Sequence, residues 1–289
     1  MSDKARVIAE ILRTTLPGGP LDFTELLTVS AMAALGKNRV DAEAFVETNL
    51  KRYWNWFLEE LDSQRSRGIT PYFSVANSKA KSFAVRHEEL VLSADAATSR
   101  RGELYRSRPP FLTQIATLTD RQYEALSCLT CRHIGAANVH LTPPGSEGGI
   151  DFVATIRLSS QSHIFSSAGR DFRVVGQSKK YGTKVTVDRI DQFLRTMENV
   201  RSRSTRVSAH LPAWFDVSAG PIVGWIIAHS GYQSGSADEA KKHGLVLSDT
   251  LDVAESLTLA ESFHAAATPV ARAAQVGPAC DAIVTEFTV

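Results

Sequence analysis

Apolar residues recur at helical spacing through the first third of the chain, and alternating or continuous apolar runs follow later. Helices are expected over residues 3–16, 22–35 and 40–61, because apolar side chains fall three and four positions apart in each. Two short strands around a polar turn are expected over residues 70–76 and 82–86. Three helices followed by a basic hairpin is the order of a winged-helix module, so the N-terminal part is predicted to be mainly helical and winged-helix-like.

The pattern changes after Thr119, which is placed to cap a helix that ends near Gly135. From there the chain alternates in the order α-β-β-β-α-β-α-β-α. Strands are expected over residues 138–141, 150–158, 172–179, 222–228 and 245–247, and helices after Thr186, over residues 237–243 and from about Leu251. This order predicts an α/β fold with a mixed sheet flanked by helices. Residues 265–289 show no pattern that assigns them.

The same patterns suggest a division into domains. Residues 96–115 are rich in Ser, Ala, Thr and Arg and contain a Pro-Pro pair, which indicates a linker. A winged-helix-like domain is therefore expected over residues 1–95, a second domain over residues 116–264 and a C-terminal extension over residues 265–289.

Composition is that of an ordinary globular protein, with 43% hydrophobic and 22% charged residues. The net charge of +1 gives no broad positive field, so a nucleic-acid surface has to come from local clusters of Lys and Arg. Three cysteines, an odd number, fit a reducing compartment better than a disulfide framework. The longest apolar run, residues 221–228, is shorter than the roughly 20 residues that span a bilayer. We therefore expect a cytoplasmic protein without a membrane partner.

The most informative residues are Asp151, which follows a glycine-rich turn, and Gln177 and Lys179, which end a predicted strand. Side chains alternate across a strand, so Gln177 and Lys179 share a face and Ser178 points to the other. If the Asp151 strand pairs with this one in a hairpin, three polar groups converge at one end of the sheet. Burying such groups unpaired costs several kcal/mol, so their presence favours a functional site.

These residues suit metal-dependent phosphodiester hydrolysis. Mg²⁺, with Mn²⁺ as a substitute, takes oxygen ligands, here the carboxylate of Asp151, the amide oxygen of Gln177 and the carbonyl of Ser178. Lys179 is suited to orient the attacking water and to stabilise charge in the transition state. Glu124, on the preceding helix, either holds a water at the metal or is simply an exposed helix residue. Glu147 is more consistent with a solvated turn residue than with a ligand.

The motifs resemble the Mrr-like branch of the PD-(D/E)xK nuclease superfamily, in which a helix with a Glu precedes a Gly-Gly-Ile-Asp strand and a strand ending Gln-x-Lys. The matching residues are Glu124, Gly148-Gly-Ile-Asp151, Gln177-Ser-Lys179 and Lys180-Tyr181. The resemblance continues through residues 187–197, 229–240 and 245–257, and covers about half of the chain. It departs from the family pattern at His229, where a small hydroxyl residue is usual, and in an insertion over residues 159–170.

The resemblance implies double-stranded DNA as substrate, Mg²⁺ dependence and a homodimer or higher homo-oligomer that cuts both strands. Phosphate contacts are expected from basic side chains of residues 116–264, the expected nuclease domain, and from the helix and hairpin of residues 1–95, the expected DNA-recognition domain. These residues are Lys180, Lys184, Arg201 and Arg203 in the former, and Lys51, Arg52, Lys79 and Lys81 in the latter. Each group is also consistent with a solvated surface.

The predicted function is therefore that of a restriction-type endonuclease that defends against foreign DNA. Two alternatives stay open: a catalytically silent DNA-binding regulator, and an effector nuclease that a partner switches on. The spacing Cys128-x-x-Cys131-x-His133 resembles half of a zinc site, but no second ligand pair lies at a suitable spacing. Two cysteines packed inside a helix explain it better.

Overall fold

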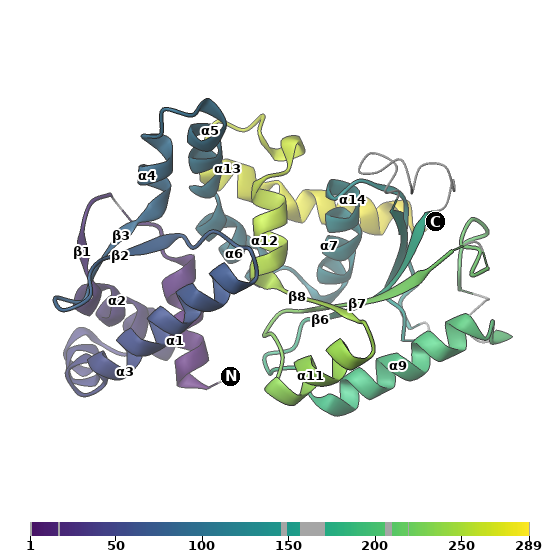
Figure 1. Cartoon of the computed structure of the whole chain (residues 1–289), viewed down its shortest axis with the longest axis horizontal. Helices are drawn as coiled ribbons and strands as arrows, with labels where there is room; N and C mark the ends of the chain where they lie inside the picture. The colour runs from purple at the N-terminus through teal and green to yellow at the C-terminus, as the bar shows by residue number, and fades with distance from the viewer. Residues whose placement is uncertain are drawn as a thin grey trace. The chain divides into compact units, whose positions relative to one another are not determined.

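The computed structural model describes residues 2–16, 18–145, 149–156, 171–205, 210–218 and 220–288, apart from the side chains of residues 87–89. Its chain (Figure 1) divides into two compact units. The first unit contains Met1–Thr113 and Glu261–Ala273, and the second contains Gln114–Ala260 and Ala274–Val289. The functional domain limits expected from the sequence stay a prediction.

The first unit begins with a helix, a short strand, two helices and a β-hairpin. These are α1 (Asp3–Arg13), β1 (Leu21–Asp22), α2 (Phe23–Leu35), α3 (Arg39–Ser66), β2 (Phe73–Asn77) and β3 (Ser82–Val85). The three strands form an antiparallel sheet in the order β1-β3-β2. The winged-helix-like order expected from the sequence is confirmed. Among these elements β1 was not expected, because two residues are too few to show an alternating pattern.

Aromatic rings hold the hairpin against α3. Phe57 of α3 is fully buried, and its ring centroid lies 5.6 Å from that of Phe73 in β2 and 5.8 Å from that of Phe83 in β3. Phe23, at the start of α2, lies 5.0 Å from Phe57. Such aromatic pairs contribute about 0.5–1.5 kcal/mol each beyond the burial of their area, so this cluster fixes the hairpin on the helices.

The segment expected to be a linker is helical. It contains α5 (Ala96–Tyr105) and most of α6 (Arg108–Thr117), after a short helix α4 (Arg86–Val91). The side chain of Asp95 caps α5 by accepting a 2.7 Å hydrogen bond from Thr98 N. The Pro-Pro pair falls in the first turn of α6, where the missing N–H groups have no intrahelical partner to lose. Proline there starts a helix rather than breaking one.

The second unit has the predicted order of elements. They are α7 (Asp120–His133), β4 (Ala136–Leu141), β5 (Phe152–Ile156), β6 (Phe172–Lys179), α9 (Val187–Arg201), β7 (Ile222–Ala228), α11 (Ser234–Lys242), β8 (Val246–Asp249) and α12 (Thr250–Thr258). The strands form one sheet in the order β4-β5-β6-β7-β8, antiparallel as far as β6 and parallel from β6 to β8. The expected α/β class with a mixed sheet is confirmed. The predicted insertion at 159–170 lies outside the described residues.

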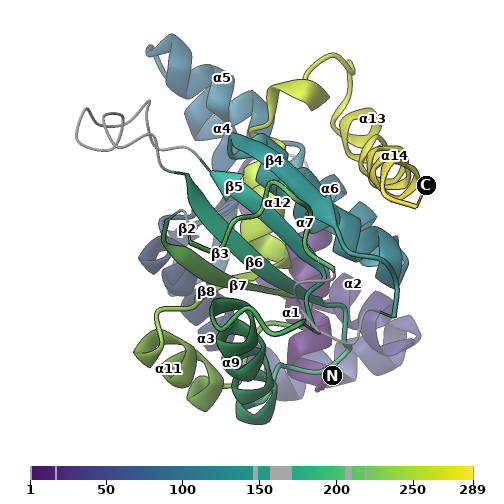
Figure 2. The same cartoon turned by 90° about the vertical axis from the view of Figure 1, so that its right-hand side faces the viewer.

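Helices cover both faces of this sheet, with α7 and α12 on one and α9 and α11 on the other (Figures 1 and 2). The face towards α9 is apolar: Val153 of β5, Val175 of β6 and Ile226 of β7 pack with Phe193 and Met197. The face towards α7 carries a polar contact described below. The sheet is therefore a rigid platform whose strand ends are available for function.

The C-terminal segment that had no assignment from sequence contains η1 (Glu261–Phe263), α13 (Pro269–Ala274) and α14 (Val276–Glu286). Helix α14 packs on α7, and two side-chain contacts join them: Gln122 Nε2 donates to Asp281 at 2.8 Å, and Arg132 meets Glu286 at 2.7 Å. Thus the last helix belongs to the second unit.

The three cysteines are buried free thiols. Cys128 and Cys131 lie inside α7, as expected for two packed helical cysteines, and burial raises the pKa of the Cys131 thiol to about 12. Within the described ranges, no helix has both the length and the apolarity needed to cross a bilayer.

Candidate active site

The β5–β6 pairing brings Asp151 to the end of β6. In this antiparallel pair Phe152 lies opposite Gly176 and Val153 opposite Val175. The main-chain N–H of Asp151 continues the pairing with a 2.9 Å hydrogen bond to the carbonyl of Gly176. Asp151 therefore sits immediately before β5 and beside the last residues of β6.

Strand alternation places three side chains on one face. Val153 and Val175 both pack towards α9, so Asp151, Gln177 and Lys179, each an even number of residues away, lie on that same face. Ser178 points the other way, where its Oγ lies 2.7 Å from Oγ of Ser127 in α7. The strand pairing expected from the sequence is present and puts the three side chains on one face, while their convergence on one site and their catalytic roles stay a proposal.

Asp151 also contacts the main chain of β6. Its Oδ2 accepts a 2.7 Å hydrogen bond from the N–H of Ser178. The N–H and C=O of one residue in a strand point towards the same edge, so the carbonyl of Ser178 faces the side of the strand on which this carboxylate lies. Two oxygens of different chemical type, one charged and one neutral, are thereby directed to the same edge of β6.

Gln177 connects this site to the glycine turn that precedes Asp151. The side chain is 4% exposed, and its Nε2 donates a 2.9 Å hydrogen bond to the carbonyl of Gly149. Gly149 has a φ of +69°, and a Cβ there would lie 3.0 Å from Oγ1 of Thr196. A residue with a side chain would therefore be both strained and crowded. Glu147 and Gly148 lie outside the described residues.

Glu124 reaches the site from α7, where Arg121 holds it. Arg121 Nη1 lies 2.6 Å from Glu124 Oε2, and its Nη2 donates to the carbonyl of Thr142 at 2.8 Å. Thr142 in turn donates its N–H to the carbonyl of Asp151 at 3.0 Å. A continuous set of contacts therefore joins the helix carboxylate to the backbone that carries the strand carboxylate.

The charges of the site act on one another. The pKa of Asp151 is raised to about 6, mainly by burial; the Ser178 N–H, Lys179 and Arg121 oppose this rise, and the neighbouring charge of Glu124 adds to it. All three of the charged side chains are therefore close enough to Asp151 to interact with it. The ammonium of Lys179 lies 5.7 Å from the ring centroid of Tyr181, which is within range of a cation–π contact.

The donor atoms fit a hard divalent cation. Among the described residues, no three or more His, Cys, Asp or Glu side chains are grouped so that they could hold a metal ion. The site around Asp151 therefore lacks the nitrogen and sulfur ligands of a structural zinc site. The oxygens of Asp151, Gln177 and Ser178 match the preference of Mg²⁺, which keeps several waters and uses one or two carboxylates. The residues present therefore fit the expected cofactor.

Sequence reasoning missed two residues that support this geometry. Arg121 lies three positions before Glu124, a spacing at which helical side chains meet, and this was the available signal. His229, noted only as a departure from the family pattern, holds the end of β6: its N–H donates to the carbonyl of Lys179 at 2.9 Å, and its Nδ1 lies 3.0 Å from Oγ1 of Thr250. No local spacing links residue 229 to residue 179, so this contact depends on the strand pairing.

The basic residues predicted to contact DNA in the second unit fall in two places. Lys180 and the exposed Lys184 follow β6, close in sequence to Lys179. Arg201 and Arg203 lie at the end of α9, and Arg203 is 3.9 Å from Asp216. Hydrogen bonds from Ser218 lower the pKa of Asp216, and smaller effects of Arg203 and Arg173 act in the same direction. Arg173 is at the start of β6, and Lys179 is at its other end, about 20 Å away at the strand rise. Because Arg203 and Arg173 both lie near Asp216, Arg203 is at the end of β6 that is far from Asp151.

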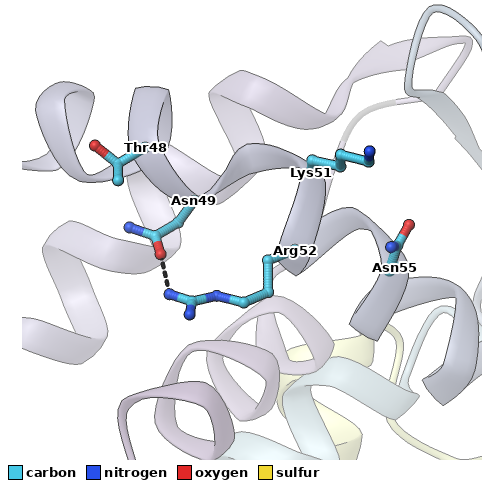
Figure 3. Close-up of a pocket in the computed structure, with 5 residues that line it drawn as sticks. All are labelled: Thr48, Asn49, Lys51, Arg52 and Asn55. Atoms are coloured by element: carbon cyan, nitrogen blue, oxygen red, sulfur yellow. Dashed lines mark hydrogen bonds between the residues drawn. The ribbon is translucent and has the colours of Figure 1, made fainter.

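In the first unit, Lys51 and Arg52 are exposed on α3, where they line a shallow hollow together with Thr48, Asn49 and Asn55 (Figure 3). Arg52 turns towards Asn49 and donates to its Oδ1, whereas Lys51 extends away from it. Lys79 and Lys81 lie in the turn between β2 and β3, and only Lys79 is fully exposed. Contact of these residues with DNA stays a prediction.

One family model matches the part of the chain that contains these residues. Residues 115–210, about a third of the chain, match the family model Mrr_cat, described as a restriction endonuclease. This confirms the resemblance inferred from the motifs, since the matched range contains Glu124, Asp151, Gln177 and Lys179. No curated protein matches the chain in sequence.

Three solved structures are similar to parts of the chain. The restriction endonuclease MspJI in complex with a 27-mer oligonucleotide is 14% identical over 68% of this chain and 37% of its own, with a TM-score of 0.35. The DNA modification-dependent restriction endonuclease AspBHI is 18% identical over 62% of this chain and 40% of its own, with a TM-score of 0.37. The restriction endonuclease FokI bound to DNA is 11% identical over 89% of this chain and 44% of its own, with a TM-score of 0.38. The chain thus spans less than half of each of these proteins.

Proposed function

We propose, from the premise that residues 115–210 form a restriction endonuclease domain of the Mrr family, that this chain is a metal-dependent endonuclease that hydrolyses phosphodiester bonds of double-stranded DNA. The observation that carries the proposal is the common face of Asp151, Gln177 and Lys179 at the end of the β5–β6 pair. An otherwise apolar sheet face has no packing reason to end in a carboxylate, an amide and an ammonium group.

Mg²⁺ is the proposed cofactor, and Mn²⁺ is expected to substitute. The Asp151 carboxylate, the Ser178 carbonyl and the Gln177 amide oxygen would hold it, because they are hard oxygen donors at one strand edge. When bound, the ion supplies positive charge that polarises the phosphate and acidifies a water molecule. Because Nε2 of Gln177 donates to the carbonyl of Gly149, the amide oxygen is the atom that would be available to the cation.

The remaining charged side chains act on the substrate and on water. The ammonium of Lys179 is placed to orient the attacking water and to stabilise the negative charge that develops on the phosphate oxygens. Glu124 approaches the same site from α7 and can accept a hydrogen bond from a water there. Arg121 keeps its carboxylate directed towards the Asp151 backbone through Thr142.

The wider biological role follows from the reaction. A single site cuts one strand, so cleavage of both strands is expected to need a homodimer or higher homo-oligomer. The winged-helix-like unit is proposed to select the site or its modification, with phosphate contacts from Lys51 and Lys79. Restriction of foreign DNA in the cytoplasm is the role that we propose.

The test is cleavage of supercoiled plasmid by the full chain with Mg²⁺ and with EDTA, on methylated and on unmethylated DNA. We expect cleavage only with the metal. Asp151→Asn and Lys179→Met are expected to reduce the rate by about 100-fold or more, which is typical for loss of one electrostatic or metal-binding group. The control Lys242→Met removes an exposed lysine of α11 that pairs with Glu239 at 2.9 Å, and it should cleave normally.

Three outcomes would contradict the proposal. Cleavage that is insensitive to EDTA would show that the reaction does not need a metal ion. Full activity of Asp151→Asn would show that catalysis takes place at another site. DNA binding without cleavage on either plasmid would favour the silent regulator instead.

A further inference from the structure

Arg121 connects the Glu124 carboxylate, through Thr142, to the main chain at Asp151. Its Nη1 lies 2.6 Å from Oε2 of Glu124, and its Nη2 donates to the carbonyl of Thr142, the residue whose N–H donates to the carbonyl of Asp151. The salt bridge is mostly shielded, since the Arg121 and Glu124 side chains are 22% and 29% exposed. It therefore differs from the largely exposed ion pairs found elsewhere on the surface, such as Arg39 with Glu25.

The side chains of the site are electrically balanced without any metal. Asp151 and Glu124 carry two negative charges when ionised, and Arg121 and Lys179 carry two positive charges. A guanidinium group does not lose its proton in proteins.

We propose that Arg121 is the internal counter-cation of this site, and that a divalent metal has to compete with it for Glu124. The inference rests on the proposed metal-dependent function and deepens it, because it assigns the residue that sets the metal concentration at which the site fills. Arg121 is a positioning residue: it acts on the metal through Glu124.

Two physical consequences follow from this arrangement. A divalent ion at Asp151 places two positive charges close to a permanent guanidinium charge, so the two cations repel each other. Metal binding would also draw Glu124 away from Arg121, while the bond from Nη2 to the Thr142 carbonyl provides an anchor that the metal does not disturb. Removing the positive charge at position 121 should therefore strengthen metal binding, in contrast to the loss expected from removing a supporting residue.

The experiment measures metal binding without DNA. Free Mn²⁺ is followed by electron paramagnetic resonance and Mg²⁺ binding by calorimetry, with the wild-type chain, Arg121→Gln, Arg121→Lys and Arg132→Gln. Arg132 is the matched control, because it lies on α7, as Arg121 does, and forms a salt bridge with Glu286 of α14. It is eleven residues, or about 16 Å, farther along α7 than Arg121. This distance exceeds the Debye length at physiological salt.

We expect Arg121→Gln to lower the dissociation constant for Mn²⁺ about three- to tenfold, as removal of one nearby charge typically does. Arg121→Lys keeps the charge and Arg132→Gln removes a distant one, so both should stay within about twofold of wild type. In a Glu124→Gln background the change Arg121→Gln should tighten binding less, because competition for the shared carboxylate is gone and only the direct repulsion is relieved. Unchanged or weaker binding by Arg121→Gln would overturn the inference.

The design separates this inference from the proposed function. If the wild-type chain and Asp151→Asn bind metal equally poorly, the metal site itself fails and the inference fails with it. If Asp151-dependent binding is present but Arg121→Gln does not tighten it, the inference alone fails. Should Arg121→Gln not fold by circular dichroism, Glu124→Gln alone decides: several-fold weaker Mn²⁺ binding supports competition for this carboxylate, and unchanged binding excludes it.

Discussion

The main-chain N–H of Ser178 donates a 2.7 Å hydrogen bond to Oδ2 of Asp151. This bond favours the ionised carboxylate, and so do the charges of Lys179 and Arg121, yet burial outweighs them and leaves the pKa of Asp151 raised to about 6. Ionisation of this carboxylate in the folded chain is therefore less favourable than that of an ordinary Asp side chain. Such a group gains from a cation, which is the expected property of a metal ligand.

The first prediction concerns stability. The pKa of Asp151 is about 6 in the folded chain, against an ordinary value of 3.8 for this carboxyl. Between these two pH values the folded chain binds a proton that the unfolded chain has lost. The free energy of unfolding therefore falls as pH rises through this window. Asp151→Asn removes the effect and should raise the free energy of unfolding at pH 8 in EDTA by at most about 3 kcal/mol. Urea unfolding at pH 8, 6 and 4.5 should show this gain shrinking towards low pH.

Asp95 is the control for this measurement, because the pKa of its carboxyl is shifted in the opposite direction. Hydrogen bonds from Thr98 lower the pKa of the Asp95 carboxyl, which caps α5. Asp95→Asn should therefore give no stability gain at pH 8. Equal gains in both variants would show that the effect of Asp151→Asn has nothing to do with a buried charge.

The second prediction concerns the pH dependence of cleavage. Protons and metal compete for Asp151, so at low Mg²⁺ the cleavage rate should fall as pH is lowered through about 6. Raising Mg²⁺ tenfold should move the midpoint of this fall to lower pH. Initial rates on plasmid DNA over pH 5 to 8 at two Mg²⁺ concentrations measure the shift. A midpoint that is independent of Mg²⁺ would argue that another group controls the rate.

The third prediction explains the glycine before Gln177. A Cβ on Gly176 would lie 1.9 to 2.4 Å from ring atoms of Phe152, which is fully buried and cannot swing aside. Gly176→Ala should therefore destabilise the chain by about 1–3 kcal/mol, the usual effect of overpacking. Thermal unfolding of Gly176→Ala, Phe152→Leu and the double variant tests this. The double variant should lose less than the sum of the single changes, and strict additivity would contradict the clash.

The elements of the second unit could be predicted because each shows its own local pattern. Residues 222–228 are a continuous apolar run, residues 172–179 were expected as the strand that ends in Gln177 and Lys179, and the bounds of both match β7 and β6. The alternation of Gln177 and Lys179 follows from strand geometry alone. Thr186 was correctly placed just before α9, although its side chain makes no capping hydrogen bond.

The remaining features depend on tertiary structure. Helix α14 was missed because its alanines and glycine blur a pattern in which Val276, Cys280 and Ile283 are buried at helical spacing. The helices α5 and α6 were mistaken for a linker because the Pro-Pro pair was interpreted as a break rather than as a first turn. The raised pKa of Asp151 could not be foreseen at all, since it comes from burial and from charges that lie at least 27 residues away in sequence, such as Glu124.

The fourth prediction concerns the end of α9. Arg203 has a φ of +55°, in the left-handed region that favours glycine, and Ser204 N closes the helix by donating to Asn199 O at 3.0 Å. Arg203→Gly relieves the strain, whereas Arg203→Ala removes the same side chain without relieving it. The Gly variant should be more stable than the Ala variant by about 1 kcal/mol, measured by urea unfolding. A more stable Ala variant would show that the backbone is not strained there.

The fifth prediction tests whether the winged-helix-like unit contacts DNA through phosphates. Lys51 on α3 and Lys79 in the β2–β3 turn are exposed, and a lysine that neutralises a phosphate releases a counterion on binding. Lys51→Gln and Lys79→Gln should each weaken binding to unrelated duplexes alike and should reduce the slope of log affinity against log salt by about 1. Fluorescence anisotropy with the full chain in EDTA, at several salt concentrations, measures both quantities without cleavage.

The same measurement distinguishes a contact from a general charge effect. Lys242→Gln removes an equal charge from α11, where the lysine is 69% exposed and paired with Glu239, and it should leave the slope unchanged. If Lys51→Gln instead weakens binding to one sequence much more than to others, Lys51 takes part in base recognition, because phosphate contacts carry no sequence information. If all three variants behave as wild type, the basic residues of α3 and the turn are a solvated surface and DNA selection lies elsewhere in the chain.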